Sequence, residues 1–284
     1  MDRIDKLMTS AWAVTPSARG SLMMMVGSAI KSGRMGDLLT LIEANKPKAS
    51  VANAERGMSN WDGDWQAGMG ASIGILELRG FLYSWKTGDA ARILKEMFAD
   101  DRITGVVLVI DGPGGHIDGV DVLAGMIKEA DKPVAAFVSG QACSAYYWLA
   151  TACDRIVCAS PLCDVGCVGV YTSFYNDKKY WESMGIDVRD IYADTSDLKN
   201  EEFRAIADNN DEQPLLDRLN KLNAAFCTSV ADGLDIAYDA QLPLFRGRTY
   251  LAQEALTMGY VDEVGSLDEA IEWVIGNAEA RKWM

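Results

Sequence analysis

Short apolar runs alternate with amphipathic stretches through most of the chain. The clearest run, residues 105–110, is continuous and rich in β-branched side chains, as in strands that a parallel sheet buries on both faces. Strands that alternate with helical stretches of about ten to fifteen residues are typical of α/β folds with a largely parallel sheet. The pattern predicts strands at 73–79, 105–110, 133–138, 155–158, 168–171 and 188–192, and helices at 89–98, 117–130, 144–152, 212–232, 251–259 and 266–275.

The N-terminal quarter of the chain differs from the rest in composition and in hydrophobic pattern. Residues 1–70 contain Met-rich and Ala-rich helical stretches and end in a loop at 57–70 that is dense in glycine and aspartate. Because such a loop interrupts periodic structure, we predict a helical leader and linker at 1–70 and a main domain at 71–284. The C-terminal segment, from residue 212 onward, is expected to be mostly helical.

Composition narrows the class of protein. The chain has 284 residues, 49% of them hydrophobic, which is enough for a sizeable core in a globular protein. Its formal net charge of −14 repels the phosphates of nucleic acids and of anionic lipids, so we expect neither as a partner. The apolar stretch 21–30 is about half as long as a membrane span, and Asp2 and Asp5 stand where a secretory signal would be basic. The sequence therefore predicts neither secretion nor a membrane anchor.

Cysteine usage points to a reducing compartment. Of six cysteines, five lie within 25 residues, without the paired spacing of a zinc site or the spread of a secreted disulfide framework. We interpret them as small apolar side chains. The sequence predicts no metal site and no cofactor.

Candidate chemistry is concentrated in two short segments that follow apolar strands. Asp111-Gly-Pro-Gly-Gly115 ends one strand with a glycine pair whose backbone N–H groups no side chain obstructs. In Gly140-Gln-Ala-Cys-Ser144, a turn of small residues presents a hydroxyl at the start of a helix. A nucleophile beside free N–H groups supplies the parts of an acyl-transfer site. The plainer alternatives are a tight turn for the glycines and a helix cap for the serine.

The order of these segments resembles the Clp/crotonase superfamily, and within it the signal peptide peptidase A (protease IV) family of serine peptidases. The family's Asp-Ser-Pro-Gly-Gly is similar to residues 111–115, with Gly112 in place of serine. Its nucleophile motif, a serine followed by small residues and tyrosine, is similar to Ser144-Ala-Tyr-Tyr147. Further phrases similar to the family's lie at 153–161, 165–170 and 247–265, so that the resemblance extends over about residues 71–276.

The resemblance implies a Clp/crotonase-like fold built from repeated ββα units and a hydrolase with a Ser-Lys dyad. Ser144 is then the nucleophile, and the family's lysine, a little over fifty residues later, corresponds to Lys199, 55 residues beyond the serine. A lysine partly buried against apolar walls loses its charge more easily and accepts the serine proton near neutral pH. The competing lysines are Lys178 and Lys179, and the plain alternative for Lys199 is a solvated loop residue.

The resemblance also assigns the groups around the nucleophile. The N–H groups of Gly114, Gly115 and Ala145 are expected to form the oxyanion hole. His116, the single histidine of the chain, is interpreted as a loop or cleft residue and not as the base. Cys143 is interpreted as a packing residue.

The start of the chain resembles one branch of the family. Ser10-Ala-Trp-Ala-Val-Thr-Pro16 and the helical leader after it are similar to the phage and prophage members, which are head-maturation (capsid assembly) proteases. The resemblance implies scaffold, portal or capsid proteins as substrates, inside an immature phage head (prohead) in the host cytoplasm. It also implies a homo-oligomer, with Lys199 acting within one chain or on a neighbouring protomer.

Three other functions stay open at the level of the sequence. A soluble cellular peptidase of the signal peptide peptidase type would have the same dyad. A crotonase-type acyl-CoA enzyme would share the fold and the oxyanion-binding glycines but use acidic catalytic groups. A scaffold- or portal-associated protein would keep the fold without activity.

Overall fold

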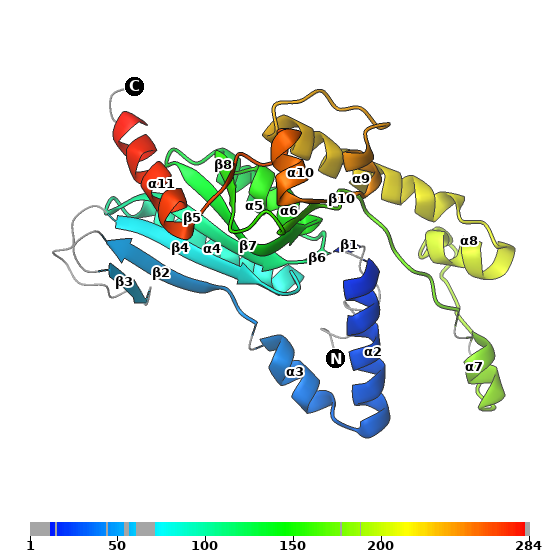
Figure 1. Cartoon of the computed structure of the whole chain (residues 1–284). Helices are drawn as coiled ribbons and strands as arrows, with labels where there is room; N and C mark the ends of the chain where they lie inside the picture. The colour runs from blue at the N-terminus through cyan, green and yellow to red at the C-terminus, as the bar shows by residue number, and fades with distance from the viewer. Residues whose placement is uncertain are drawn as a thin grey trace.

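The computed structural model describes residues 12–14, 16–43, 45–53, 57–60, 72–176, 178–187 and 189–281. Within these residues a nine-stranded sheet forms the centre, in the order β10-β9-β7-β5-β4-β2-β3, with β8 beside β7 and β11 beside β8 (Figure 1). A separate pair of strands, β1 and β6, completes the β-structure. The strands are β1 (Trp12–Val14), β2 (Lys48–Asn53), β3 (Gly57–Asn60), β4 (Ser72–Arg79), β5 (Ile103–Gly112), β6 (Gly114–His116), β7 (Val134–Cys143), β8 (Arg155–Cys158), β9 (Asp164–Gly166), β10 (Thr249–Leu251) and β11 (Glu263–Val264).

The central strands run parallel and are buried on both faces. β4, β5, β7 and β8 pair in parallel, and β9 runs parallel to the end of β7. The apolar run of β5 is buried from Val106 to Ile110, because helices cover both sides of the sheet. This arrangement confirms the predicted α/β class with a largely parallel sheet.

Two layers of helices enclose the sheet. One face of β4, β5 and β7 packs against α4, α5, α6 and α9 in the largest apolar cluster, and the other face packs against α11 through Ala270 and Val274. The helices are α2 (Pro16–Ser32), α3 (Met35–Glu43), α4 (Ser84–Ala99), α5 (Val120–Lys128), α6 (Ala145–Thr151), α7 (Lys178–Ser183), α8 (Glu201–Asn209), α9 (Gln213–Gly233), α10 (Ala252–Thr257) and α11 (Leu267–Arg281), with a 3-10 turn, η1 (Pro243–Arg246).

The predicted helical leader is only partly helical. α2 and α3 pack on each other around Leu22, Val26 and Leu38, but β2 follows them and pairs antiparallel with β4 in the main sheet. The sheet thus begins ahead of the expected boundary at residue 70, which stays a prediction, and most of the expected loop at 57–70 lies outside the described residues. Among the helices that are described, none is both long enough and apolar enough to cross a bilayer.

Two predicted strands are wrong. Residues 168–171 follow the turn at Gly166 and Cys167 and form no strand: Tyr171 makes an isolated bridge, and the Val170 N–H donates to Asn223 Oδ1 at 3.1 Å. In the predicted strand 188–192, Ile191 is 92% exposed and the described residues lie beyond the sheet, so no neighbouring strand is available. Short apolar runs need a pairing partner, which local pattern does not reveal.

Helix α6 is held on three sides. The Tyr147 hydroxyl donates to the Tyr260 carbonyl at 2.6 Å, and the Trp148 indole donates to Ser229 Oγ at 2.7 Å and stacks on Phe226 at 4.6 Å. At Gly233 the end of α9 approaches the backbone of α6 so closely that no side chain fits between them.

Lys86 is a buried lysine on α4. Its side chain is 1% exposed, and its Nζ donates to the carbonyls of Arg79 and Phe81, the latter at 3.3 Å, in the turn between β4 and α4. Burial lowers the pKa of Lys86 to about 7. Sequence patterns mark lysines as surface residues, so this anchor of the turn was not predicted.

Substituting Gly233 tests the contact between α9 and α6. In Gly233→Ala the added Cβ would lie 2.0 Å from the Thr151 carbonyl oxygen, so one helix must shift. We expect urea denaturation to show a loss of about 1–3 kcal/mol in the free energy of unfolding. The matched control is Gly276→Ala in α11, where nothing lies within 4 Å of the new Cβ and stability should rise by up to about 1 kcal/mol. Equal effects of the two substitutions would contradict the packing.

Lys86 should make stability depend on pH. The folded chain binds the Lys86 proton more weakly than the unfolded chain does, so its contribution to stability rises with pH from about 7 to 10.5. Buried cysteines such as Cys158, whose pKa burial raises to about 12, act in the opposite direction above about pH 9. Between about pH 6.5 and 8.5 we expect the wild type to gain about 2 kcal/mol relative to Lys86→Gln, measured by urea denaturation. Parallel pH curves for the two proteins would show that Lys86 is charged in the fold.

Candidate active site

The register of two neighbouring strands brings the glycine pair and the serine together. β5 and β7 run parallel, and their last aligned pair is Gly112 with Ala142. Two residues beyond that pair, the chains reach Gly114 and Ser144. Because parallel strands end at the same edge of a sheet, the predicted oxyanion donors and the predicted nucleophile lie side by side.

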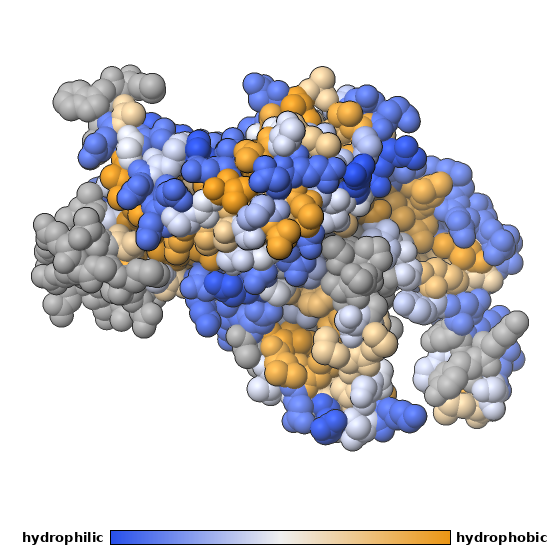
Figure 2. Space-filling view, viewed as in Figure 1, coloured by the Kyte–Doolittle hydropathy of each residue, from blue (hydrophilic) through white to orange (hydrophobic). Residues whose placement is uncertain are grey.

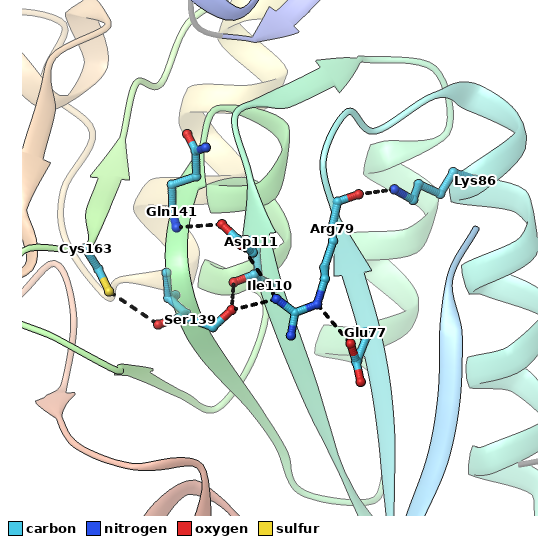
Figure 3. A network of polar contacts seen from close by, with 9 residues as sticks. Glu77, Arg79, Lys86, Ile110, Asp111, Ser139, Gln141 and Cys163 are labelled. Carbon is cyan, nitrogen blue, oxygen red and sulfur yellow. Dashed lines mark hydrogen bonds and ion pairs between the residues drawn. The ribbon is translucent and has the colours of Figure 1, made fainter. Parts of the chain in front are cut away.

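A polar network ties the ends of three strands (Figure 3). On β5, Asp111 accepts the Gln141 N–H of β7 through Oδ1 at 3.3 Å and faces the Arg79 guanidinium of β4 at 3.6 Å. Arg79 also donates to Ser139 Oγ of β7 at 3.3 Å and to Glu77 at 2.9 Å. Since Arg79 and Asp111 are partly exposed, the ion pair itself adds little stability. Its role is to fix the three strand ends relative to one another.

Ser144 adopts a backbone conformation that is unusual for a serine. Its φ is 57° and its ψ is −119°, and it directly precedes α6. Such a conformation costs about 1–3 kcal/mol, and here the surroundings fix it. The Ser144 N–H donates to the Gly166 carbonyl at 2.7 Å, and the Ser144 carbonyl accepts the Trp148 N–H at 3.0 Å.

The Ser144 hydroxyl is enclosed and has no hydrogen-bond partner. The residue is 0% exposed, and Oγ bonds to no polar atom of the part of the chain that the structure describes. It makes no capping hydrogen bond to α6. The geometry thus gives no support to the alternative in which Ser144 is merely a helix cap, because a cap would accept an N–H of the first turn.

The glycine pair occupies space that only glycine can fill. Gly114 has a φ of 100°, which L side chains rarely adopt. At Gly115 a Cβ would lie 1.9 Å from the Leu82 carbonyl oxygen, since Leu82 hydrogen-bonds to both neighbours of Gly115. The two glycines are therefore required by the backbone geometry.

Gly112, which departs from the family's serine, lies against Tyr146. A Cβ at Gly112 would lie 2.1 Å from Cε2 of Tyr146 and 2.4 Å from the Gly80 carbonyl oxygen. The Tyr146 ring is 0% exposed, and its hydroxyl makes no hydrogen bond within the described residues. Burial, with Asp111 and Tyr83 nearby, raises the pKa of Tyr146. The sequence showed the departure at Gly112 but not the ring that lies against it.

The three predicted oxyanion donors take different positions. Ala145 is the first residue of α6, where an N–H has no acceptor within the helix, and it is buried. Gly114 lies at the turn out of the sheet. Gly115 lies in β6 opposite Ala13 of β1, where its peptide groups are engaged by that strand. Gly114 and Ala145 are thus better placed than Gly115 to bind an oxyanion, and the oxyanion hole stays a prediction.

Lys199 is not near the serine hydroxyl in the single chain. It lies on an exposed turn ahead of α8, where its N–H donates to the Ser196 carbonyl at 3.1 Å. Because Ser144 Oγ has no hydrogen-bond partner among the described residues, Lys199 is outside hydrogen-bond reach of it. The segment between α7 and α8 projects beyond the sheet (Figure 1). Lys178 is likewise exposed, on α7.

The other candidate residues are buried. His116, expected in a loop or cleft, lies in β6 with 0% exposure, its ring edge-on to Tyr83 at 5.9 Å. Cys143 is 1% exposed, and burial raises the pKa of its thiol, which fits a packing role and not a reactive one. All six cysteines are free and buried. In the described part of the chain no cluster of His, Cys, Asp and Glu side chains could hold a metal ion.

A cavity adjoins the nucleophile turn. Its volume is about 460 Å³, and it lies between the segment Cys167–Tyr171, the Leu216–Asn223 stretch of α9 and the turn at Phe245–Gly247. The segment begins directly after Gly166, whose carbonyl accepts the Ser144 N–H. The cavity therefore begins one residue after the backbone group that binds the Ser144 N–H.

Known proteins resemble this chain over about two thirds of its length. The head-tail preconnector protein GP5 of Enterobacteria phage P21 is 29% identical over 184 residues, covering 63% of this chain and 35% of the phage protein. The capsid assembly protease C of Escherichia phage lambda is 26% identical over 204 residues, covering 70% and 46%. Protease 4 of Salmonella typhi is 23% identical over 193 residues, covering 67% and 31%. The chain thus matches less than half of the length of each of these relatives.

The family model of Peptidase family S49 matches residues 126–281, more than half of the chain. The match begins within α5, passes through the nucleophile turn and α9, and ends with α11. It includes Ser144, Ala145 and Lys199 and leaves the glycine pair outside. Together with the separated motifs and the parallel sheet, it shows that the chain belongs to peptidase family S49 and has a Clp/crotonase-like fold.

Proposed function

We propose that this chain is a serine endopeptidase with Ser144 as nucleophile and Lys199 as general base. The observation that carries the proposal is the Ser144 turn, where a strained backbone presents an enclosed hydroxyl beside the glycine pair. Strain of this kind persists only where the surrounding structure enforces it, and it concentrates at functional sites. Membership of peptidase family S49 supports the same chemistry.

The proposed reaction needs these groups together in one site. Ser144 Oγ attacks the carbonyl carbon of a substrate peptide bond while its proton passes to the neutral amine of Lys199. The carbonyl oxygen becomes an oxyanion, which accepts hydrogen bonds from the N–H groups of Gly114 and Ala145. The protonated Lys199 then gives its proton to the leaving nitrogen, and the C–N bond breaks. Water attacks the acyl-enzyme with Lys199 again as base, which releases the new carboxyl end and restores Ser144.

We propose that a second copy of the chain completes the site. The residues around Lys199 expose large apolar side chains: Ile191 is 92% exposed, Leu198 68% and Phe203 38%. Figure 2 shows apolar atoms along this projecting part of the molecule. Exposed apolar surface of this kind marks a protein interface. Packing of the α7–α8 segment on a neighbouring protomer would bury Lys199 and bring its amine to Ser144.

We propose head assembly of a phage as the setting. Two relatives are named for it, a head-tail preconnector protein and a capsid assembly protease, and the start of the chain resembles the same branch. The substrates would then be scaffold, portal or capsid proteins in an immature head within the host cytoplasm. The strong negative charge favours such protein substrates over nucleic acid.

A second candidate is a cellular peptidase of the signal peptide peptidase type, which the similarity to Protease 4 favours. The two functions differ in substrate. A cellular peptidase would cleave short peptides unaided, whereas a head-assembly protease would cleave the head proteins encoded beside it. Cleavage of those proteins by the purified chain distinguishes the two.

Substitution of the dyad tests the proposed chemistry. Ser144→Ala should reduce cleavage of a protein substrate by about 10³-fold or more, because the attacking oxygen is lost. Lys199→Ala should reduce it by about 10²–10⁴-fold, because the serine proton has no acceptor. Lys178→Ala, on an exposed helix nearby, is the control and should cleave like the wild type. Full activity in Ser144→Ala would overturn the proposal, and full activity in Lys199→Ala would overturn the assignment of the base.

Mixed oligomers test whether the site is shared. If Lys199 of one protomer serves Ser144 of its neighbour, oligomers assembled by co-expression from equal amounts of Ser144→Ala and Lys199→Ala chains regain about a quarter of wild-type activity, since random mixing forms that fraction of complete sites. If both residues act within one chain, every site lacks one of them and the mixture stays inactive. Each variant purified alone is the control, and light scattering verifies that the mixture is oligomeric.

A further inference from the structure

A strand from the start of the chain lies on the outer edge of the glycine pair. β1 pairs antiparallel with β6, so that Val14 lies opposite Gly114, Ala13 opposite Gly115 and Trp12 opposite His116. The two strands form a sheet of their own, apart from the main sheet. The backbone beside Ser144 is therefore covered by another part of the same chain.

The hydrogen bonds between β6 and Leu82 show which peptide groups of β6 face β1. The Gly114 carbonyl accepts the Leu82 N–H at 2.9 Å, and the His116 N–H donates to the Leu82 carbonyl at 2.8 Å. Alternate residues of a strand direct their peptide groups to the same side, so the N–H and C=O of Gly115 point to the opposite side. There its register partner is Ala13.

An extended substrate needs that same edge. Proteins that bind extended peptides commonly add them as a strand to an open sheet edge, where main-chain hydrogen bonds supply affinity. Gly115 is next to the predicted oxyanion donor Gly114, so a peptide paired with it would run past Ser144. Among the described residues, Leu82 occupies one edge of β6 and β1 the other. No edge is left open for a substrate.

We propose that β1 occupies the place of the substrate and holds the chain in a self-inhibited state, from which an incoming protein strand displaces it. This inference rests on the proposed peptidase function. β1 is suited to displacement because it has three residues and pairs only with β6 among the described strands. Two-stranded pairs of this size are marginally stable on their own.

Because β1 is joined to α2, it stays at a high local concentration beside β6 and competes there with a substrate strand. α2 begins two residues after β1 and packs through Leu22 and Val26 on a cluster that includes Tyr83, next to Leu82. A competitor held in this way raises the substrate concentration needed for half-maximal rate and leaves the rate at saturation unchanged.

Ala13→Pro in the full chain is the decisive variant. Proline has no N–H to donate to the Gly115 carbonyl, so β1 should leave β6. For the cleavage of a protein substrate we expect KM to fall about tenfold with kcat unchanged, because the competent fraction of sites rises. The matched control is Val14→Pro. The N–H of Val14 points away from β6, and an outward-facing N–H on an edge strand is where proline is tolerated, so its KM should equal that of the wild type.

Amide hydrogen exchange gives a readout that does not depend on activity. In the Ser144→Ala chain we expect the Gly115 amide to exchange slowly, to exchange about tenfold faster once Ala13→Pro is added, and to stay slow with Val14→Pro. Equal Gly115 exchange with and without Ala13→Pro would overturn the inference, as would faster exchange with an unchanged KM. If no chain with Ser144 intact cleaves protein, the proposed function fails, and the exchange rates still decide whether β1 covers the edge.

Discussion

The site depends on the parallel register of β5 and β7. The alignment of Gly112 with Ala142 sets where each strand leaves the sheet, and hence where Gly114 and Ser144 lie. A slip of one residue would move one chain by about 3.3 Å and turn its side chains to the other face, which would separate the hydroxyl from the glycine pair. Asp111, bonded across to β7, and the apolar residues buried on both faces of the two strands hold that register.

The two halves of the proposed dyad differ in how firmly the fold holds them. Ser144 precedes a wholly buried helix that Tyr147 and Trp148 fasten to the C-terminal part of the chain, so its strained backbone has no room to relax. Lys199 lies on an exposed turn, near apolar side chains that stay exposed in the described part of the chain. The proposed nucleophile is thus preorganised within one chain, whereas the proposed base is not brought to it. If the proposed dyad is shared between protomers, an unassembled chain is inactive.

The sequence predicts the central fold well because the signals there are local. Apolar runs marked the positions of β4, β5, β7 and β8, although β7 continues to Cys143, through most of the segment predicted as a turn. The failures involve long-range partners. Residues 168–171 are apolar but form no strand in the described structure, β2 joins the sheet from a region assigned to the leader, and Lys86 is buried by carbonyls that only the folded turn brings to it. The candidate site residues come from motif order, and neither the position of Lys199 in space nor the pairing of β1 with β6 has a signature in local pattern.

The contact between Gly112 and Tyr146 constrains how this chain can diverge. A side chain at 112 would meet the aromatic ring at 2.1 Å and the Gly80 carbonyl oxygen at 2.4 Å, while loss of the ring alone would leave a void. A serine at 112 therefore needs both a smaller residue at 146 and a displaced backbone at residue 80. The three positions should change together among homologous chains, and a change at one of them alone should be rare.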